Sequence, residues 1–311
     1  MVMLTVGFTF TYMMEGFPNF AHTTYTGVGA ITSFYLTTFF KLNPYLTIPP
    51  SALVGGSLGV LLYRLVVHPI KRNGGYQEIT LTLTFIVLAT VLPSFFYIFN
   101  FWARYFANAP TRGYNLRRFD FTYNGLKGIT IVSTLACLIL IIALRVFLTK
   151  TKTGISLRAV AENPDLAATI GVNTLRAHTL SWFISGALAS LVGSIMTIHK
   201  GVGIAGPDGL IISIMAGAVL GGVNNLYGAI VGGLFVAVAE DLLKDFFYVF
   251  LRLGVERWAR LLPVGFLVAA LMVFPNGVFG PTGLNLEEVR EAARRLLRGP
   301  PGGTKASPHQ N

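Results

Sequence analysis

Long apolar stretches alternate with short polar or glycine-rich connections along most of this chain of 311 residues. A helix needs about 20 apolar residues to cross a bilayer, and most of the stretches reach that length. The pattern therefore predicts an all-α, polytopic membrane helical bundle with about 8 or 9 transmembrane segments. The stretches fall at residues 2–14, 20–40, 46–68, 79–101, 128–149, 178–199, 210–222, 226–250 and 260–279.

Composition supports a membrane protein. Hydrophobic residues make up 53% of the chain and charged residues 12%, whereas a soluble domain carries about 25% charged residues. The formal net charge of +11 would suggest nucleic acid as the partner of a soluble protein. Here we expect no nucleic acid, because basic loops facing the cytoplasm and anionic lipid account for the charge.

Basic residues cluster at 68–72, 145–176 and 290–298. If all three clusters lie in the cytoplasm, nine segments cross the membrane in alternating directions, with the N-terminus outside and the C-terminus inside. We therefore expect a multi-pass protein of the cell (plasma or inner) membrane. This placement leaves one basic loop outside, contrary to the rule that basic loops face the cytoplasm. It contains Arg104, Arg112, Arg117, Arg118 and Lys127.

A polar segment of about twenty residues, longer than a tight turn requires, separates two apolar stretches at 154–173. Asn163 and Pro164 are typical of the cap and first residue of a helix, and Asp165 then lies in its first turn. Gly171 is suited to end that helix. The segment predicts a short helix outside the membrane that contacts another subunit.

Small residues four apart predict close contacts between helices, since they let two backbones approach where lipid supplies no hydrophobic driving force. The repeated pattern Gly-Ala-Val-Leu-Gly-Gly and Gly-Ala-Ile-Val-Gly-Gly makes one such contact especially clear. Its candidate packing residues are Gly217, Gly221, Gly228 and Gly232. The pairs Gly55/Gly59 and Ala189/Gly193 follow the same spacing.

Several segments, in order along nearly the whole chain, resemble the permease subunits of ABC importers for branched-chain amino acids. Asp165-Leu166-Ala167 followed by Gly171 is similar to the Glu-Ala-Ala…Gly coupling segment of such permeases. Glu15 is unusual at its position. The other segments that carry the resemblance are 18–22 with Gly27 and Gly29, 82–86, 158–173, 218–233 and 274–280.

The resemblance implies one permease half of an ATP-driven importer. Its expected partners are a homologous second permease, two ABC ATPase subunits and an extracytoplasmic substrate-binding protein. Residues 1–284 would form the permease domain, with a coupling segment at 150–177. Residues 285–311 would form a cytoplasmic amphipathic helix and a disordered tail. The expected substrate is a branched-chain or related amino acid.

Two sets of candidate site residues follow. For coupling to the ATPase, acidic side chains would pair with its basic residues, while small ones leave a low profile that fits a groove. The coupling candidates are Arg158, Glu162, Asp165, Ala167 and Gly171. Polar groups near the start of an apolar stretch mark either a pathway or contacts between helices. The candidates for the translocation pathway are Asn19, His22, Gly27 and Gly29.

Nothing in the sequence is typical of an enzyme. It contains no Gly-Lys pair and hence no phosphate-binding Gly-x-x-x-x-Gly-Lys-[Ser/Thr] loop, and no His-Glu-x-x-His motif. We therefore expect no catalytic residue, metal site or cofactor, with ATP bound by the partner subunits. The alternative is a self-sufficient channel or secondary carrier for a small polar solute such as an amide or urea. Those classes use polar groups at mid-membrane or broken helices.

Overall fold

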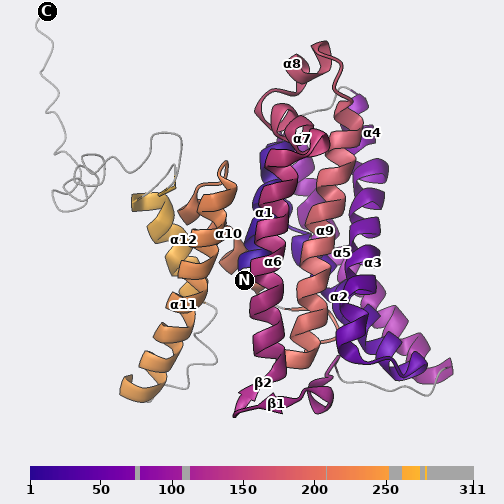
Figure 1. The fold of residues 1–311 in the computed structure, drawn as a ribbon, viewed down its shortest axis with the longest axis vertical. Helices are drawn as coiled ribbons and strands as arrows, with labels where there is room; N and C mark the ends of the chain where they lie inside the picture. Colours follow the sequence, from indigo (N-terminus) through magenta and orange to yellow (C-terminus); the bar gives the residue numbers. More distant parts are fainter. Residues whose placement is uncertain (74–77, 107–112, 208, 252–260, 274–276, 279–311) are drawn as a thin grey trace, which may run out of the picture.

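The computed structural model describes residues 1–73, 78–106, 113–207, 209–251, 261–273 and 277–278. Each of the nine apolar stretches contains a helix (Figure 1). The helices of these stretches are α1 (Val2–Glu15), α2 (His22–Phe40), α3 (Ile48–Leu62), α5 (Glu78–Phe106), α6 (Gly128–Lys150), α9 (Thr174–His199), α10 (Leu210–Gly221), α11 (Leu226–Leu251) and α12 (Leu261–Val273). The prediction of a polytopic helical membrane protein is confirmed.

Shorter elements connect these helices. A π-helical turn, η2 (Tyr63–Val67), joins α3 to α4 (His68–Arg72). The remaining elements are η1 (Pro44–Thr47), η3 (Arg117–Phe119), the antiparallel strands β1 (Thr122–Tyr123) and β2 (Leu126–Lys127), α7 (Lys152–Glu162) and α8 (Pro164–Thr169).

Length and composition distinguish the complete spans from the shorter helices. Five helical stretches of the described residues are long and apolar enough to cross a membrane: Pro44–Arg72, Glu78–Tyr105, Gly128–Lys150, Thr174–His199 and Leu226–Phe246. Helices α10 and α12 are apolar but shorter, and α1 has 14 residues. The apolar stretches at 2–14 and 210–222 therefore form helices shorter than a complete span.

The two ends of the bundle differ. Helices α4, α7 and α8 lie together at one end, and the β1–β2 hairpin lies at the opposite end (Figure 1). The basic cluster at 68–72 therefore shares an end with the polar segment between α6 and α9, as the predicted alternation requires. We call these the α7–α8 end and the hairpin end.

Helix α9 forms the centre of the bundle and α6 lies at its periphery. In the most apolar 18-residue stretch of each helix, 72% of α9 is buried inside the protein, against 6% of α6. Glycines make the close approach to α9 possible. A Cβ atom on Gly29 of α2 would overlap the carbonyl group of Ser190, and one on Gly193 would overlap that of Thr26. Backbones this close gain dispersion contacts that larger residues would prevent.

Helices α10 and α11 make a second close contact, through the glycines that the sequence singled out. A Cβ atom on Gly221 would overlap the carbonyl group of Gly228, and one on Gly232 would overlap the carbonyl oxygen of Gly217. The short α10 is therefore held against α11 backbone to backbone.

The chain turns back into the bundle between α1 and α2. Glu15, at the end of α1, contacts the first turns of α9, whereas His22, at the start of α2, reaches the carbonyl oxygen of Leu4 in the first turn of α1. Helix α2 therefore begins at the level of the start of α1, inside the protein. Irregular backbone is tolerated at that depth only where it is enclosed by protein or lines a cavity.

Candidate functional site

The polar segment between α6 and α9 folds into two short capped helices. The side chain of Thr151 accepts a hydrogen bond from the backbone N–H of Gly154 at 3.0 Å and caps α7. The side chain of Asn163 accepts one from Leu166 N–H at 2.9 Å and caps α8, whose first residue is Pro164. Gly171 follows α8 with φ +86°, a conformation that favours glycine. The short helix predicted after Asn163 is confirmed.

One face of α7 and α8 is packed onto the bundle. Leu157 and Val160 of α7 are each 1% exposed, and Ala167 of α8 is 2% exposed. Their hydrophobic cluster also contains Phe10 and Met14 of α1, Leu148 of α6 and Ala177 of α9. The α7–α8 segment is therefore in direct contact with three membrane helices, α1, α6 and α9.

The opposite face is apolar at its centre and acidic at its edge. Leu166 and Ile170, four residues apart, are 62% and 73% exposed, and Glu162 and Asp165 are exposed beside them. An exposed apolar patch rimmed by polar groups is typical of a protein contact surface. We call Glu162, Asp165, Leu166 and Ile170 the coupling surface, after the contact with an ATPase that the sequence predicts for this segment; that contact stays a prediction.

The structure changes the list of coupling candidates. The expectation that Ala167 faces outward is wrong, because its side chain fills the cluster beneath α8. Leu166 and Ile170, which were not among the candidates, are the exposed apolar residues of α8 and its C-terminal cap. Gly171 is exposed, with nothing within 4 Å of a Cβ built on it. Arg158 lies in a cavity beside α7.

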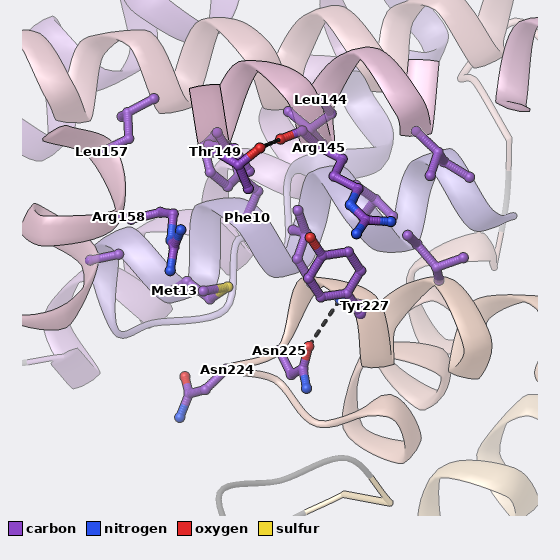
Figure 2. A pocket seen from close by; sticks show the side chains of 16 residues that line it. Phe10, Met13, Leu144, Arg145, Thr149, Leu157, Arg158, Asn224, Asn225 and Tyr227 are labelled. Atoms are coloured by element: carbon purple, nitrogen blue, oxygen red, sulfur yellow. Dashed lines mark hydrogen bonds between the residues drawn. The ribbon is translucent and has the colours of Figure 1, made fainter. Parts of the chain in front are cut away.

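That cavity has a volume of about 230 Å³ and lies between α1, α6, α7 and the start of α11. Figure 2 shows Arg145 and Arg158 on opposite sides of it, with Tyr227 along a third side. The guanidinium carbon of Arg145 lies 5.8 Å from the centre of the Tyr227 ring. A second, more open pocket of about 380 Å³ is lined by residues of α3, η2 and α9 that include Arg64 and Arg176.

The pathway candidates lie inside the bundle. His22 is fully buried, with Nε2 3.1 Å from the carbonyl oxygen of Leu4. Asn19 is 1% exposed, and its backbone carbonyl accepts a hydrogen bond from His22 N–H at 3.1 Å. Gly27 packs against the ring of Phe96, and Gly29 against α9. None of the four lines either pocket. His22, Gly27 and Gly29 thus contact neighbouring helices, whereas Asn19 bonds the first turn of α2. A pathway role for the four residues stays a prediction.

At the α7–α8 end, a buried carboxylate accepts hydrogen bonds from side chains of α4 and α9. Glu15 is 2% exposed. It accepts hydrogen bonds from Lys71 Nζ at 2.6 Å, His178 Nδ1 at 2.8 Å and Trp182 Nε1 at 2.8 Å. The ring of Tyr63 stacks on His178, with centroids 5.8 Å apart. These four residues with Glu15 form the Glu15 cluster, which connects α1, η2, α4 and α9.

A buried charge in a membrane protein is costly unless it is paired, and such residues are commonly functional. The sequence marked Glu15 as unusual but named no partner for it. Among the described residues, no group of three His, Cys, Asp or Glu side chains could hold a metal ion.

At the hairpin end, hydrogen bonds to the backbone join the loop before the hairpin to the segment that follows α9. Tyr114 and Val202 exchange backbone hydrogen bonds at 2.7 and 3.0 Å, and Arg117 donates to the carbonyl oxygen of Lys200 at 2.6 Å. Burial raises the pKa of the Tyr114 hydroxyl above its ordinary value. Phe121 and Tyr123 remain exposed beside the basic residues of this loop.

The chain is similar to known transport proteins over most of its length. It is 32% identical to the probable branched-chain amino acid transport permease protein LivH of Methanocaldococcus jannaschii, with 90% of this chain and 88% of that protein covered. It is 24% identical to the high-affinity branched-chain amino acid transport system permease protein BraD of Pseudomonas aeruginosa, with 89% and 91% covered.

Salmonella typhimurium LivH, another high-affinity permease protein of this kind, is 24% identical over 89% of this chain and 90% of its own length. No solved structure matches the chain. The model of the family described as branched-chain amino acid transport system / permease component matches residues 1–271. The chain belongs to this family of permease components.

Proposed function

We propose that this protein is the membrane-spanning permease subunit of an ATP-driven ABC importer and forms the translocation pathway for branched-chain or related amino acids. The observation that carries the proposal is the family match over residues 1–271. The exposed coupling surface on α7 and α8 supports it, because a permease without an ATP site of its own needs a contact for the subunit that has one.

In this proposal the α7–α8 end faces the cytoplasm, and each permease presents its coupling surface to one of two ABC ATPase subunits. Leu166 and Ile170 enter an apolar groove of the ATPase, and Glu162 and Asp165 pair with basic residues at its rim. ATP is bound between the ATPase subunits, so the permease carries no cofactor and performs no covalent chemistry.

The packing beneath the coupling surface supplies a route for the movement. When the ATPase subunits close, α7 and α8 push on α1, α6 and α9 through the cluster around Ala167. The Glu15 cluster holds α1, α4 and α9 together at the same end, so that these helices tilt as a unit. Rigid-body tilting of this kind switches a pathway between outward-open and inward-open states.

Two further partners complete the complex. A homologous second permease lies beside this one, and an extracytoplasmic substrate-binding protein docks at the hairpin end. Exposed aromatic residues, Phe121 and Tyr123, accompany Arg117 and Arg118 there, a composition suited to a protein contact.

The alternative, a self-sufficient channel or secondary carrier for an amide or urea, predicts flux without ATP. The break between α1 and α2 is a feature of that class, but the relatives named above are described as permeases of transport systems. The two functions differ in whether this subunit transports alone.

Reconstitution into proteoliposomes tests the proposal. The subunit is assembled with its second permease, ATPase subunits and binding protein, and uptake of labelled leucine, isoleucine and valine is followed with and without ATP inside. We expect uptake only with ATP and all components present. Equally fast uptake through the permease alone, driven by a solute gradient, would support the channel or carrier instead.

A further inference from the structure

The cavity beside α7 has no place in the proposed transport cycle. It lies at the α7–α8 end, and its walls come from α1, α6, α7 and the start of α11 (Figure 2). Its apolar wall includes Ile141, Leu144 and Leu148 of α6 and Ile230 of α11. Its polar lining consists of the two arginines together with Thr149, Asn224, Asn225 and Tyr227.

The two arginines give this cavity a positive charge, and no carboxylate of the described residues neutralises it. In the described part of the chain, neither Arg145 nor Arg158 forms an ion pair with a carboxylate. None of the described residues that line the cavity is an Asp or a Glu. Arg145 belongs to a membrane span, where a guanidinium needs a partner or access to the interface. The site is therefore suited to an anion.

The surroundings of the cavity favour an anion that carries hydrocarbon. Helix α6 is the least buried of the candidate spans, with 6% of its most apolar 18-residue stretch buried inside the protein. Its neighbouring residues Ile142 and Val146 are 61% and 50% exposed. A soluble phosphate would leave the apolar wall in water, and an amino acid would bring an ammonium group with no carboxylate to receive it.

We infer that this cavity binds an anionic phospholipid, with the headgroup phosphate between Arg145 and Arg158 and an acyl chain along the apolar face of α6. Basic pockets between membrane helices near the cytoplasmic surface are known to take such headgroups. A guanidinium pairs with a phosphate through two parallel hydrogen bonds, which makes arginine well suited to the role. A bound lipid would join α6, α7 and α11, independently of the substrate transported.

Native mass spectrometry of the intact purified chain tests the inference. Delipidated protein is titrated with phosphatidylglycerol, with phosphatidylcholine of the same acyl chains, and with glycerol 3-phosphate, which has the anionic group without the chains. The double variant Arg145→Gln/Arg158→Gln removes both guanidinium groups. Its matched control, Lys150→Gln/Lys152→Gln, removes two exposed charges from the same end that do not line the cavity.

We expect the wild type to bind phosphatidylglycerol tightly and the other two ligands weakly. The arginine variant should bind phosphatidylglycerol about thirtyfold more weakly, while the lysine control stays within about threefold of the wild type. Three results would overturn the inference: equal affinity for the two lipids, equal affinity for glycerol 3-phosphate, or the same loss in the lysine control. All four side chains are exposed, so folding should be unaffected, and a thermal unfolding curve checks this.

Discussion

The carboxylate of Glu15 accepts a hydrogen bond from the indole nitrogen of Trp182 at 2.8 Å, across 167 positions of sequence. The same carboxylate oxygen accepts a hydrogen bond from His178 Nδ1, and the other oxygen accepts one from Lys71 Nζ. The end of α1 is thus fastened to α9 and α4 by one buried group. Because the charge is enclosed, its removal should be felt far more than that of a surface charge.

Glu15→Gln tests this fastening. The amide keeps the shape of the side chain but removes the negative charge that faces Lys71, and breaking a buried pair costs about 3 to 5 kcal/mol. We expect a clear fall in the melting temperature of the detergent-solubilised protein, and loss of uptake in the assembled complex. The measurement is thermal unfolding followed by tryptophan fluorescence.

Asp241→Asn is the matched control, because that carboxylate also faces a lysine, Lys244 at 3.5 Å, but its side chain is 82% exposed. Its effect should stay within about 1 kcal/mol. Equal melting temperatures for Glu15→Gln and the wild type would show that the Glu15 cluster does not hold the helices together.

Gly232→Leu tests the contact between α10 and α11. A side chain at this position meets the backbone of Gly217 and Gly221, so the two helices must separate and lose their contacts. We expect little folded protein on size-exclusion chromatography. Gly265→Leu in α12 is the control, since nothing lies within 4 Å of a Cβ there, and it should elute as the wild type does. Wild-type elution of both variants would refute the packing role.

Features that depend on local sequence could be predicted. The apolar stretches located the membrane helices because bilayer thickness alone sets their length. Asn163 and Pro164 located the start of α8 because a cap acts on the next few residues. The glycine pairs marked the α10–α11 contact because only small residues, spaced four apart, let two helix backbones approach this closely.

Features that depend on tertiary packing could not be predicted from the sequence. The sequence marked Glu15 as unusual at its position, but its partner His178 lies 163 positions away, and no local rule connects the two residues. Helix α8 has apolar residues on both sides, so the sequence could not decide whether Ala167 or Leu166 faces the bundle. The structure buries the first and exposes the second.

Cysteine labelling tests the orientation of the bundle. On a Cys137→Ala background, Ile170→Cys reports on the α7–α8 end and Tyr123→Cys on the hairpin end; their native side chains are 73% and 65% exposed. An impermeant maleimide added to intact cells should label only Tyr123→Cys, and lysed cells should label both. Labelling of Ile170→Cys from outside would reverse the orientation and exclude an ATPase contact at this end.

The central claim, that the coupling surface carries the ATPase, is tested most directly by co-purification. In Leu166→Glu and Ile170→Glu, a charge replaces an exposed apolar group without entering the core. Loss of a central contact costs about 2 kcal/mol or more, roughly thirtyfold in affinity. Tyr123→Glu, the same change at the hairpin end, should leave ATPase recovery unchanged.

The measurement is the amount of ATPase subunit recovered per tagged permease from membranes that contain both proteins. We predict that the two α8 variants recover little ATPase while their own yield and elution volume stay normal, and that Tyr123→Glu recovers as much as the wild type. Full ATPase recovery with both α8 variants would contradict the account, because the α7–α8 segment would then not be the surface through which ATP drives this permease.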